Sequence, residues 1–140
     1  MDISSFRSID GLNAASQGTL IELLGIRFTH VENGLCCGEL VLKPEHLAAN
    51  GYLHAATVIA LADTAAGYGC VASLPEGAVG FTTIELKSNF FGTARDGTIK
   101  AEARMRHGGR TTMIWDAEVE TADGRALVAF RCTQLILWPR

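Results

Sequence analysis

The feature that most limits what this chain can fold into is an 18-residue apolar stretch, AATVIALADTAAGYGCVA, at residues 55–72. The stretch predicts a helix, and because it is apolar on every side, that helix needs to be covered all round. A bilayer would cover it, but the alanine and glycine content and an acid near the middle favour a protein core. A flat sheet would leave half of the helix in water, so the sequence predicts a curved sheet wrapped around it.

Asp63 is the only charged residue of this stretch. Burying an ionised carboxylate is costly unless it is paired, and the stretch contains no Lys or Arg. A perturbed acid with a catalytic function is therefore the leading interpretation. The alternative is an aspartate that accepts hydrogen bonds from a neighbouring strand or lies on an exposed part of the helix.

The remaining elements are expected to be one short helix and several strands. Residues 19–25 have the apolar spacing and terminal glycine of a helix. Residues 26–31 and 35–42 flank Asn33-Gly34, a strong hairpin signal. Period-two alternation predicts strands at 98–106 and 113–120, and residues 127–138 are expected to form a strand that is apolar on both faces. With residues 1–18 as a polar lead, the expectation is one domain over residues 1–140, an α+β hotdog fold in which an antiparallel sheet wraps a long helix.

Composition excludes several classes of function. Hydrophobic residues make up 48% and charged residues 19% of the 140 residues, with a formal net charge of -3, so a globular protein is expected and a nucleic-acid partner is not. The N-terminal residues lack a secretory signal, so a cytoplasmic protein with no membrane contact is expected. No metal or cofactor is expected, because the histidines show no ligand spacing with each other or with the cysteines. The cysteines are expected to be reduced and structural: Cys36, Cys37, Cys70 and Cys132.

Residues 50–65, NGYLHAATVIALADTA, resemble the signature of hotdog-fold acyl-CoA thioesterases of the phenylacetate-degradation and 4-hydroxybenzoyl-CoA thioesterase group. That family has a loop containing Asn and Gly, His-Gly-Gly at the helix start, and an acid nine residues beyond the His. His54 and Asp63 have this spacing, although Ala55-Ala56 replaces the two glycines. Residues 80–91 also look like the family's next strand. The resemblance implies hydrolysis of an aromatic or medium-chain acyl-CoA by a homodimer that assembles into a homotetramer.

The spacing itself makes a prediction about the active site. Nine helical residues rotate by about 900°, roughly 180° beyond whole turns, and rise about 13 Å. The helix start and Asp63 of one chain are therefore not expected to meet at one carbonyl, and a site shared between two chains is predicted. In this site the Ala55 N–H is the expected oxyanion donor. Asp63 is either the nucleophile or the general base that activates water, and the sequence leaves both roles open.

Three further residues are candidates for the catalytic site. His54 is expected to orient the loop or the carbonyl, or else only to cap the helix. Asn50 is expected to polarise the carbonyl or hold the water, unless Asn-Gly serves only as a turn. Thr82, which resembles a Ser/Thr position of the family, is expected to orient the water or the carboxylate, or else is an ordinary strand residue.

Several arginine and aromatic residues are candidates for binding the substrate. Arg110 and Arg95 are candidates for the CoA phosphates, and Tyr68, Phe90 and Phe91 favour an aromatic acyl group. Because alanine replaces glycine beside the oxyanion position, a non-catalytic acyl-CoA-binding domain is the main alternative. A hotdog hydratase is a weaker alternative, because its paired Asp and His motif was not found.

Overall fold

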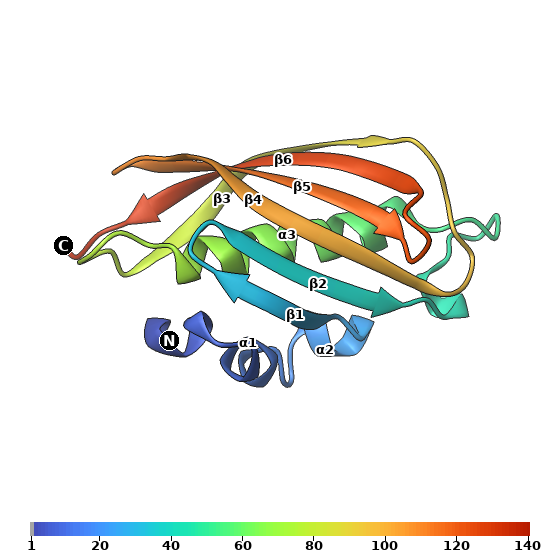
Figure 1. Ribbon diagram of the computed structural model, residues 1–140, viewed down its shortest axis with the longest axis horizontal. Coiled ribbons are helices and arrows are strands. Elements are labelled where there is room, and N and C mark those ends of the chain that lie inside the picture. The colour runs from blue at the N-terminus through green and yellow to red at the C-terminus, as the bar shows by residue number, and fades with distance from the viewer. Residues whose placement is uncertain (1) are drawn as a thin grey trace.

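A six-stranded antiparallel sheet curves around one long helix, α3 (Ala55–Ala72), in the computed structural model, which describes residues 2–140 (Figure 1). The strands are β1 (Arg27–Glu32), β2 (Leu35–Val41), β3 (Gly80–Phe90), β4 (Thr98–Gly108), β5 (Thr112–Thr121) and β6 (Ala126–Leu137). The helical elements before α3 are η1 (Ile3–Arg7), α1 (Ile9–Ala15), α2 (Leu20–Leu24) and η2 (Pro44–His46). The strand order is β1-β2-β4-β5-β6-β3, so β1 and β3 are the edges. The predicted α+β hotdog fold is confirmed.

The predicted boundaries follow from local chemistry that the structure makes visible. Thr19 caps α2 by accepting a hydrogen bond from the N–H of Ile21 (3.3 Å), and Gly25 ends the helix in the left-handed region (φ 84°). Gly34 has φ 82° in the hairpin between β1 and β2. In β4 the residues Ile99, Ala101 and Ala103 are buried against α3, as the period-two pattern predicted.

The sheet and α3 meet in a tightly packed core. Trp115 of β5 is fully buried, and Gly69 of α3 lies so close to it that a Cβ at this position would be 2.6 Å from the ring. By length and composition α3 is apolar enough to cross a bilayer, but 61% of its residues are buried inside the domain. This is the environment of a core helix.

Residues 2–18 are not a polar lead, which corrects the expectation for the N-terminal segment. Its helices η1 and α1 lie on the side of α3 that the sheet leaves open (Figure 1). Phe6 and Leu12 are only 5% and 0% exposed. Tyr68 of α3 packs against Phe6 (ring centroids 5.2 Å apart), and its hydroxyl lies 3.1 Å from the Ser16 hydroxyl oxygen. A small number of large apolar side chains attach this segment to the core. Most of its other residues are polar, so the composition did not reveal the attachment.

Candidate functional site

The start of α3 leaves one backbone donor free. The extended His54 (φ -69°, ψ 131°) is the N-cap, and its Nδ1 accepts a hydrogen bond from the N–H of Ala56 (2.9 Å). The backbone oxygen of His54 accepts from the N–H groups of Thr57 (3.0 Å) and Val58 (3.4 Å). Of the first four N–H groups of the helix, only that of Ala55 has no acceptor within residues 2–140. The expected oxyanion donor is thus unoccupied and exposed, at the positive end of the helix dipole.

His54 adds a second donor at this position. Because its Nδ1 acts as an acceptor, the neutral ring carries its proton on Nε2, and the side chain is exposed. His54 is therefore both a helix cap and a group able to donate to a ligand. Asn50 is less free, because its Oδ1 accepts from the N–H of Tyr52 (3.2 Å) beside Gly51 with φ 82°. Its position supports the turn interpretation.

Asp63 lies in the middle of α3 with one oxygen buried and unsatisfied. Its Oδ1 has no hydrogen-bond partner among the described residues, and burial raises the pKa of the carboxyl group above its ordinary value. Burial and the neighbouring negative charge of Asp63 also raise the pKa of the Cys132 thiol of β6 to about 12. Gly67, four positions after Asp63 and on nearly the same face of α3, packs against Phe81 of β3, so Asp63 lies on the side of the helix that faces β3. An unsatisfied buried carboxylate oxygen is costly and is typical of functional sites.

Within one chain, Asp63 and the helix start are too far apart to act on one carbonyl. Since α3 begins at Ala55, the eight residues to Asp63 rise about 12 Å and rotate about 80° beyond two turns. The predicted half-turn between the two groups is therefore wrong, because His54 lies outside the helix. The axial distance alone keeps the two groups of one chain apart, and a site shared between two chains stays a prediction.

The structure does not bring Thr82 to this site. Thr82 is opposite the part-exposed Leu135 of β6, on the outer face of the sheet, whereas Thr83 is opposite the fully buried Gln134 on the helix side. Thr83 donates a hydrogen bond from its hydroxyl to Gln134 Oε1 (2.7 Å), and Gln134 Nε2 donates to Cys132 Sγ (3.3 Å). Thr83 and Gln134 are not among the residues predicted from the sequence, although Gln134 stands out there as the one amide inside the apolar final strand.

The candidate substrate-binding residues lie in different parts of the molecule. Tyr68 packs against Phe6 of the N-terminal segment and Phe28 of β1, so its ring is taken up by contacts within the core. Phe90 is 46% exposed at the end of β3, and Phe91 is 62% exposed just beyond it. The Arg95 guanidinium lies 4.7 Å from the ring centroid of Tyr52, near the loop that leads to His54.

Arg110 belongs to the opposite end of α3. Its guanidinium stacks on Trp138 (4.3 Å to the ring centroid), and it lines a hollow of about 520 Å³ together with Ser73 and Pro75, which follow α3. The two arginines therefore do not converge on one ligand within a single chain. For a ligand at the start of its own α3, Arg95 is the nearer cation.

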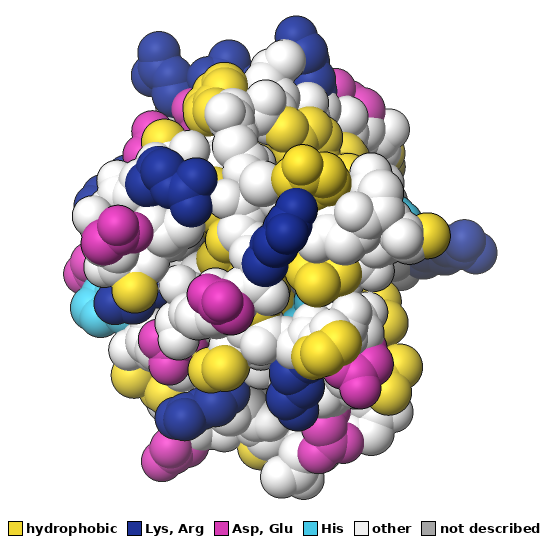
Figure 2. Space-filling view, turned by 90° about the vertical axis from the view of Figure 1, so that its right-hand side faces the viewer, with side chains coloured by type: hydrophobic (Ala, Val, Ile, Leu, Met, Phe, Trp, Pro, Cys, Tyr) yellow, Lys and Arg dark blue, Asp and Glu magenta, His cyan; other side chains and the backbone are white. Residues whose placement is uncertain are grey.

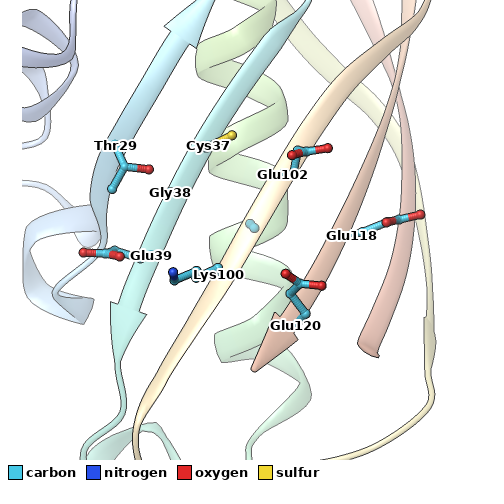
Figure 3. Close-up of a pocket in the computed structure, with 9 residues that line it drawn as sticks. Thr29, Cys37, Gly38, Glu39, Lys100, Glu102, Glu118 and Glu120 are labelled. Atoms are coloured by element: carbon cyan, nitrogen blue, oxygen red, sulfur yellow. The ribbon is translucent and has the colours of Figure 1, made fainter. Parts of the chain in front are cut away.

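A second hollow, of about 360 Å³, lies on the outer face of the sheet. Figure 3 shows Glu39, Lys100, Glu102 and Glu120 around it, with α3 behind the strands. None of the predicted site residues lines this hollow. The sheet separates it from the helix start and Asp63, so we assign it no part in the site.

Comparison with known proteins identifies the family to which these residues point. Residues 50–128 match the family described as the thioesterase superfamily. The chain is 26% identical to the 1,4-dihydroxy-2-naphthoyl-CoA hydrolase of Escherichia coli, over 93% of this chain and 95% of that protein. It is 28% identical to the proofreading thioesterase EntH of Klebsiella pneumoniae, over 93% and 94%. The crystal structure of a mutant of thioesterase PA1618 from Pseudomonas aeruginosa superposes with a TM-score of 0.88 at 25% identity, covering 93% and 94%.

Proposed function

Since this chain belongs to the thioesterase superfamily and is a thioester hydrolase of the hotdog fold, we propose that it hydrolyses an acyl-CoA thioester to the free acid and CoA. The observation that carries this proposal is that the chain has two unsatisfied groups of complementary chemistry. These are a buried Asp63 oxygen without a partner among residues 2–140 and the free Ala55 N–H at a helix start. A similar protein is named as a hydrolase of an aromatic CoA thioester, which supports CoA as the thiol. The phenylacetate and 4-hydroxybenzoyl-CoA thioesterase group remains the proposed subfamily, with an aromatic or a medium-chain acyl group as the substrate.

In the proposed reaction the thioester carbonyl oxygen accepts a hydrogen bond from the Ala55 N–H, and the exposed His54 Nε2–H is the candidate for a second donor. Negative charge that grows on this oxygen meets the positive end of α3. The Asp63 carboxylate then either takes a proton from the attacking water or attacks the carbonyl carbon to form a mixed anhydride. In the first route the C–S bond breaks as hydroxide adds, and the proton taken by Asp63 passes to the thiolate sulfur of CoA. In the second route CoA leaves as the thiolate when the anhydride forms; water then cleaves the anhydride, which releases the free acid, restores the Asp63 carboxylate and supplies the proton for CoA. Water that adds to the Asp63 carbonyl leaves its oxygen on Asp63. Transfer of ¹⁸O from labelled water into Asp63 during turnover distinguishes the anhydride route.

The two groups belong to different copies of the chain in this proposal. The edge strand β1 is largely polar and exposed, as suits an edge that faces water. The other edge, β3, exposes Ile84, Leu86 and Phe90 by 56%, 39% and 46%. Because Phe81 of β3 packs beside Gly67, one helical turn from Asp63, a second copy paired at β3 would bring its own helix start towards Asp63. We propose a homodimer joined at β3, and a cytoplasmic homotetramer built from two such dimers.

CoA carries phosphates, which favour arginine at the mouth of the site. We propose that Arg95 contacts them from the same chain as Ala55, because it lies near the loop before α3. Arg110, at the opposite end of α3, would reach the same CoA only from the second copy.

Release of free thiol from a panel of aromatic and aliphatic acyl-CoAs tests the function. We expect turnover by the wild type and a loss of about 10²–10⁴-fold in kcat for Asp63→Asn, which keeps the shape of the side chain but removes its charge. Leu23→Ala on α2, where Leu23 is 82% exposed, serves as a matched control for purification and folding. Binding of acyl-CoAs without turnover, equal in wild type and Asp63→Asn, would instead support the non-catalytic binding domain.

A further inference from the structure

A third hollow, of about 260 Å³, lies beside the start of α3, on the side where α2 approaches it. Its apolar lining comes from Leu20, Leu24 and Leu47 together with Ala56, Ala60 and the edge of His54. Figure 2 views the end of the molecule at which α3 begins and shows hydrophobic side chains reaching the surface there among charged ones. The residues that line this hollow include no Phe, Tyr or Trp.

Two small residues of α3 keep the hollow open. Ala56 and Ala60 are four positions apart, so they lie one above the other on the same face of the helix. Thr57 also lines the hollow, but its hydroxyl already donates to the His46 backbone oxygen (2.9 Å) and offers no free donor to a ligand. A larger side chain at position 60 would project into this space and fill part of it.

The hollow adjoins the free backbone donor. Ala55 lies between His54 and Ala56 in the chain, and both of these residues line the hollow. An acyl group whose carbonyl oxygen meets the Ala55 N–H therefore has its chain within reach of the hollow.

We propose that this hollow receives the acyl chain of the thioester and that the preferred chain is aliphatic, uncharged and of short to medium length. The inference rests on the proposed acyl-CoA hydrolysis. The volume of about 260 Å³ is slightly below the range of roughly 300–1,000 Å³ in which drug-sized ligands bind. Glu45 lies at the lining, and its carboxylate disfavours an acyl group that ends in a second carboxylate. Leucine and alanine walls favour a flexible methylene chain.

A chain-length series tests the proposal, with acyl-CoAs from acetyl to palmitoyl, benzoyl-CoA as the aromatic arm and glutaryl-CoA as the acidic arm. For the wild type we expect kcat/KM to rise by about fourfold per methylene until the hollow is full, the factor that corresponds to burial of one CH₂ group. Ala60→Phe should lower kcat/KM for octanoyl-CoA by at least about tenfold while acetyl-CoA is spared. Leu24→Ala, which enlarges the hollow, should move the optimum to longer chains.

The matched control is Leu23→Ala, since Leu23 is on α2 but does not line the hollow, and its chain-length profile should equal that of the wild type. Leu24→Ala keeps the test decisive if Ala60→Phe does not fold. Active enzyme whose profile is unchanged in Leu24→Ala and Ala60→Phe overturns this inference alone, as does a preference for benzoyl-CoA or glutaryl-CoA over every aliphatic chain. A wild type that turns over no thioester overturns the proposed function and the inference with it.

Discussion

Ala55→Pro removes the proposed oxyanion donor while the helix start remains intact. Ala55 is the first residue of α3, the position at which proline is tolerated best, because the lost N–H has no partner within the helix. Proline also requires an extended residue before it, and His54 already has φ -69° and ψ 131°. The hydrogen bond from Ala56 to His54 Nδ1 does not involve the deleted N–H. A main-chain donor that is normally beyond the reach of mutagenesis can thus be deleted here.

The expected decrease in kcat of Ala55→Pro depends on how strongly the N–H stabilises the negative charge on the carbonyl oxygen in the transition state. Deleting one oxyanion donor costs about 10²–10³-fold in kcat, or roughly 2.7–4 kcal/mol of transition-state stabilisation. Ala55→Gly keeps the N–H and should remain within a few-fold of the wild type. Equal melting temperatures of the two variants would show that the proline acts on the reaction and not on the fold.

Combining this variant with Asp63→Asn tests whether two chains share the site. The two variants are co-expressed with different affinity tags, and dimers that carry both tags are purified in two steps. One chain then lacks the Ala55 N–H and the other lacks the Asp63 carboxylate. If the site pairs Ala55 of one chain with Asp63 of the other, one of the two sites is intact and activity should return to about half that of the wild type per dimer.

A site contained in a single chain gives the opposite result, because every chain of the mixed dimer lacks one essential group. Mixed dimers that stay at the activity of the weaker homodimers, about 10²-fold or more below the wild type, would refute the shared site. An active monomer in light scattering would refute it as well.

Three other outcomes are expected. Because burial raises the folded-state pKa of Asp63, its contribution to stability is lost as the pH rises through that value; Asp63→Asn should unfold at higher urea than the wild type at pH 7, and the difference should vanish below about pH 4. Gly69→Ala should lower the free energy of unfolding by about 1–3 kcal/mol, because its Cβ would be 2.6 Å from the Trp115 ring, and calorimetry should show a lower Tm. Thr83→Val should destabilise the protein in urea unfolding by about 1–3 kcal/mol by leaving a buried amide oxygen unsatisfied, whereas Thr82→Val on the outer face should have little effect.

The sequence predicted the structure correctly where the hydrophobic pattern of a segment, or one residue with a strong local preference, determines it. The all-round apolarity of residues 55–72 required a wrapped helix, and Asn33-Gly34 marked the first hairpin, which the structure places between Glu32 and Leu35. Asp63 stood out because a charge without a partner is costly in such a helix. These features depend on neighbours in the chain and not on distant contacts.

The position of Thr82 could not be predicted from alternation, and the reason is a bulge. In β3 the pairing with β6 shifts between Thr83 and Glu85. Counting back from Leu86 and Phe90, which face the helix side opposite Cys132 and Val128, strict alternation would put Thr82 on the helix side as well. One extra residue in β3 moves each side chain that precedes it in the strand to the other face of the sheet. Thr83 therefore lies on the helix side, and Thr82 on the outer face.

The free Ala55 N–H could be expected from the helix start, but its availability depended on His54. Had the His54 ring turned away, the Ala56 N–H would also be free and the position of the carbonyl would be ambiguous. Because Nδ1 takes up the Ala56 donor, the helix start presents one backbone N–H and one ring N–H. The side chain thus selects which backbone group remains for the substrate.

In the proposed dimer, the packing that makes a charged Asp63 costly in one chain would make it useful for the reaction. Its buried oxygen lacks a donor within residues 2–140, and the apolar residues around it provide none. The exposed apolar side chains of β3 and the unsatisfied carboxylate of Asp63 are on neighbouring elements. A partner copy that covers the β3 side chains would therefore also approach Asp63. In the proposed dimer, burial of the β3 edge would favour association by roughly 25 cal/mol per Å² of apolar surface, against the cost of holding an acid in a poorly solvated site. Dimer formation and assembly of the active site would then be one event, and a substitution that weakens the β3 contact should reduce activity in proportion to the loss of dimer.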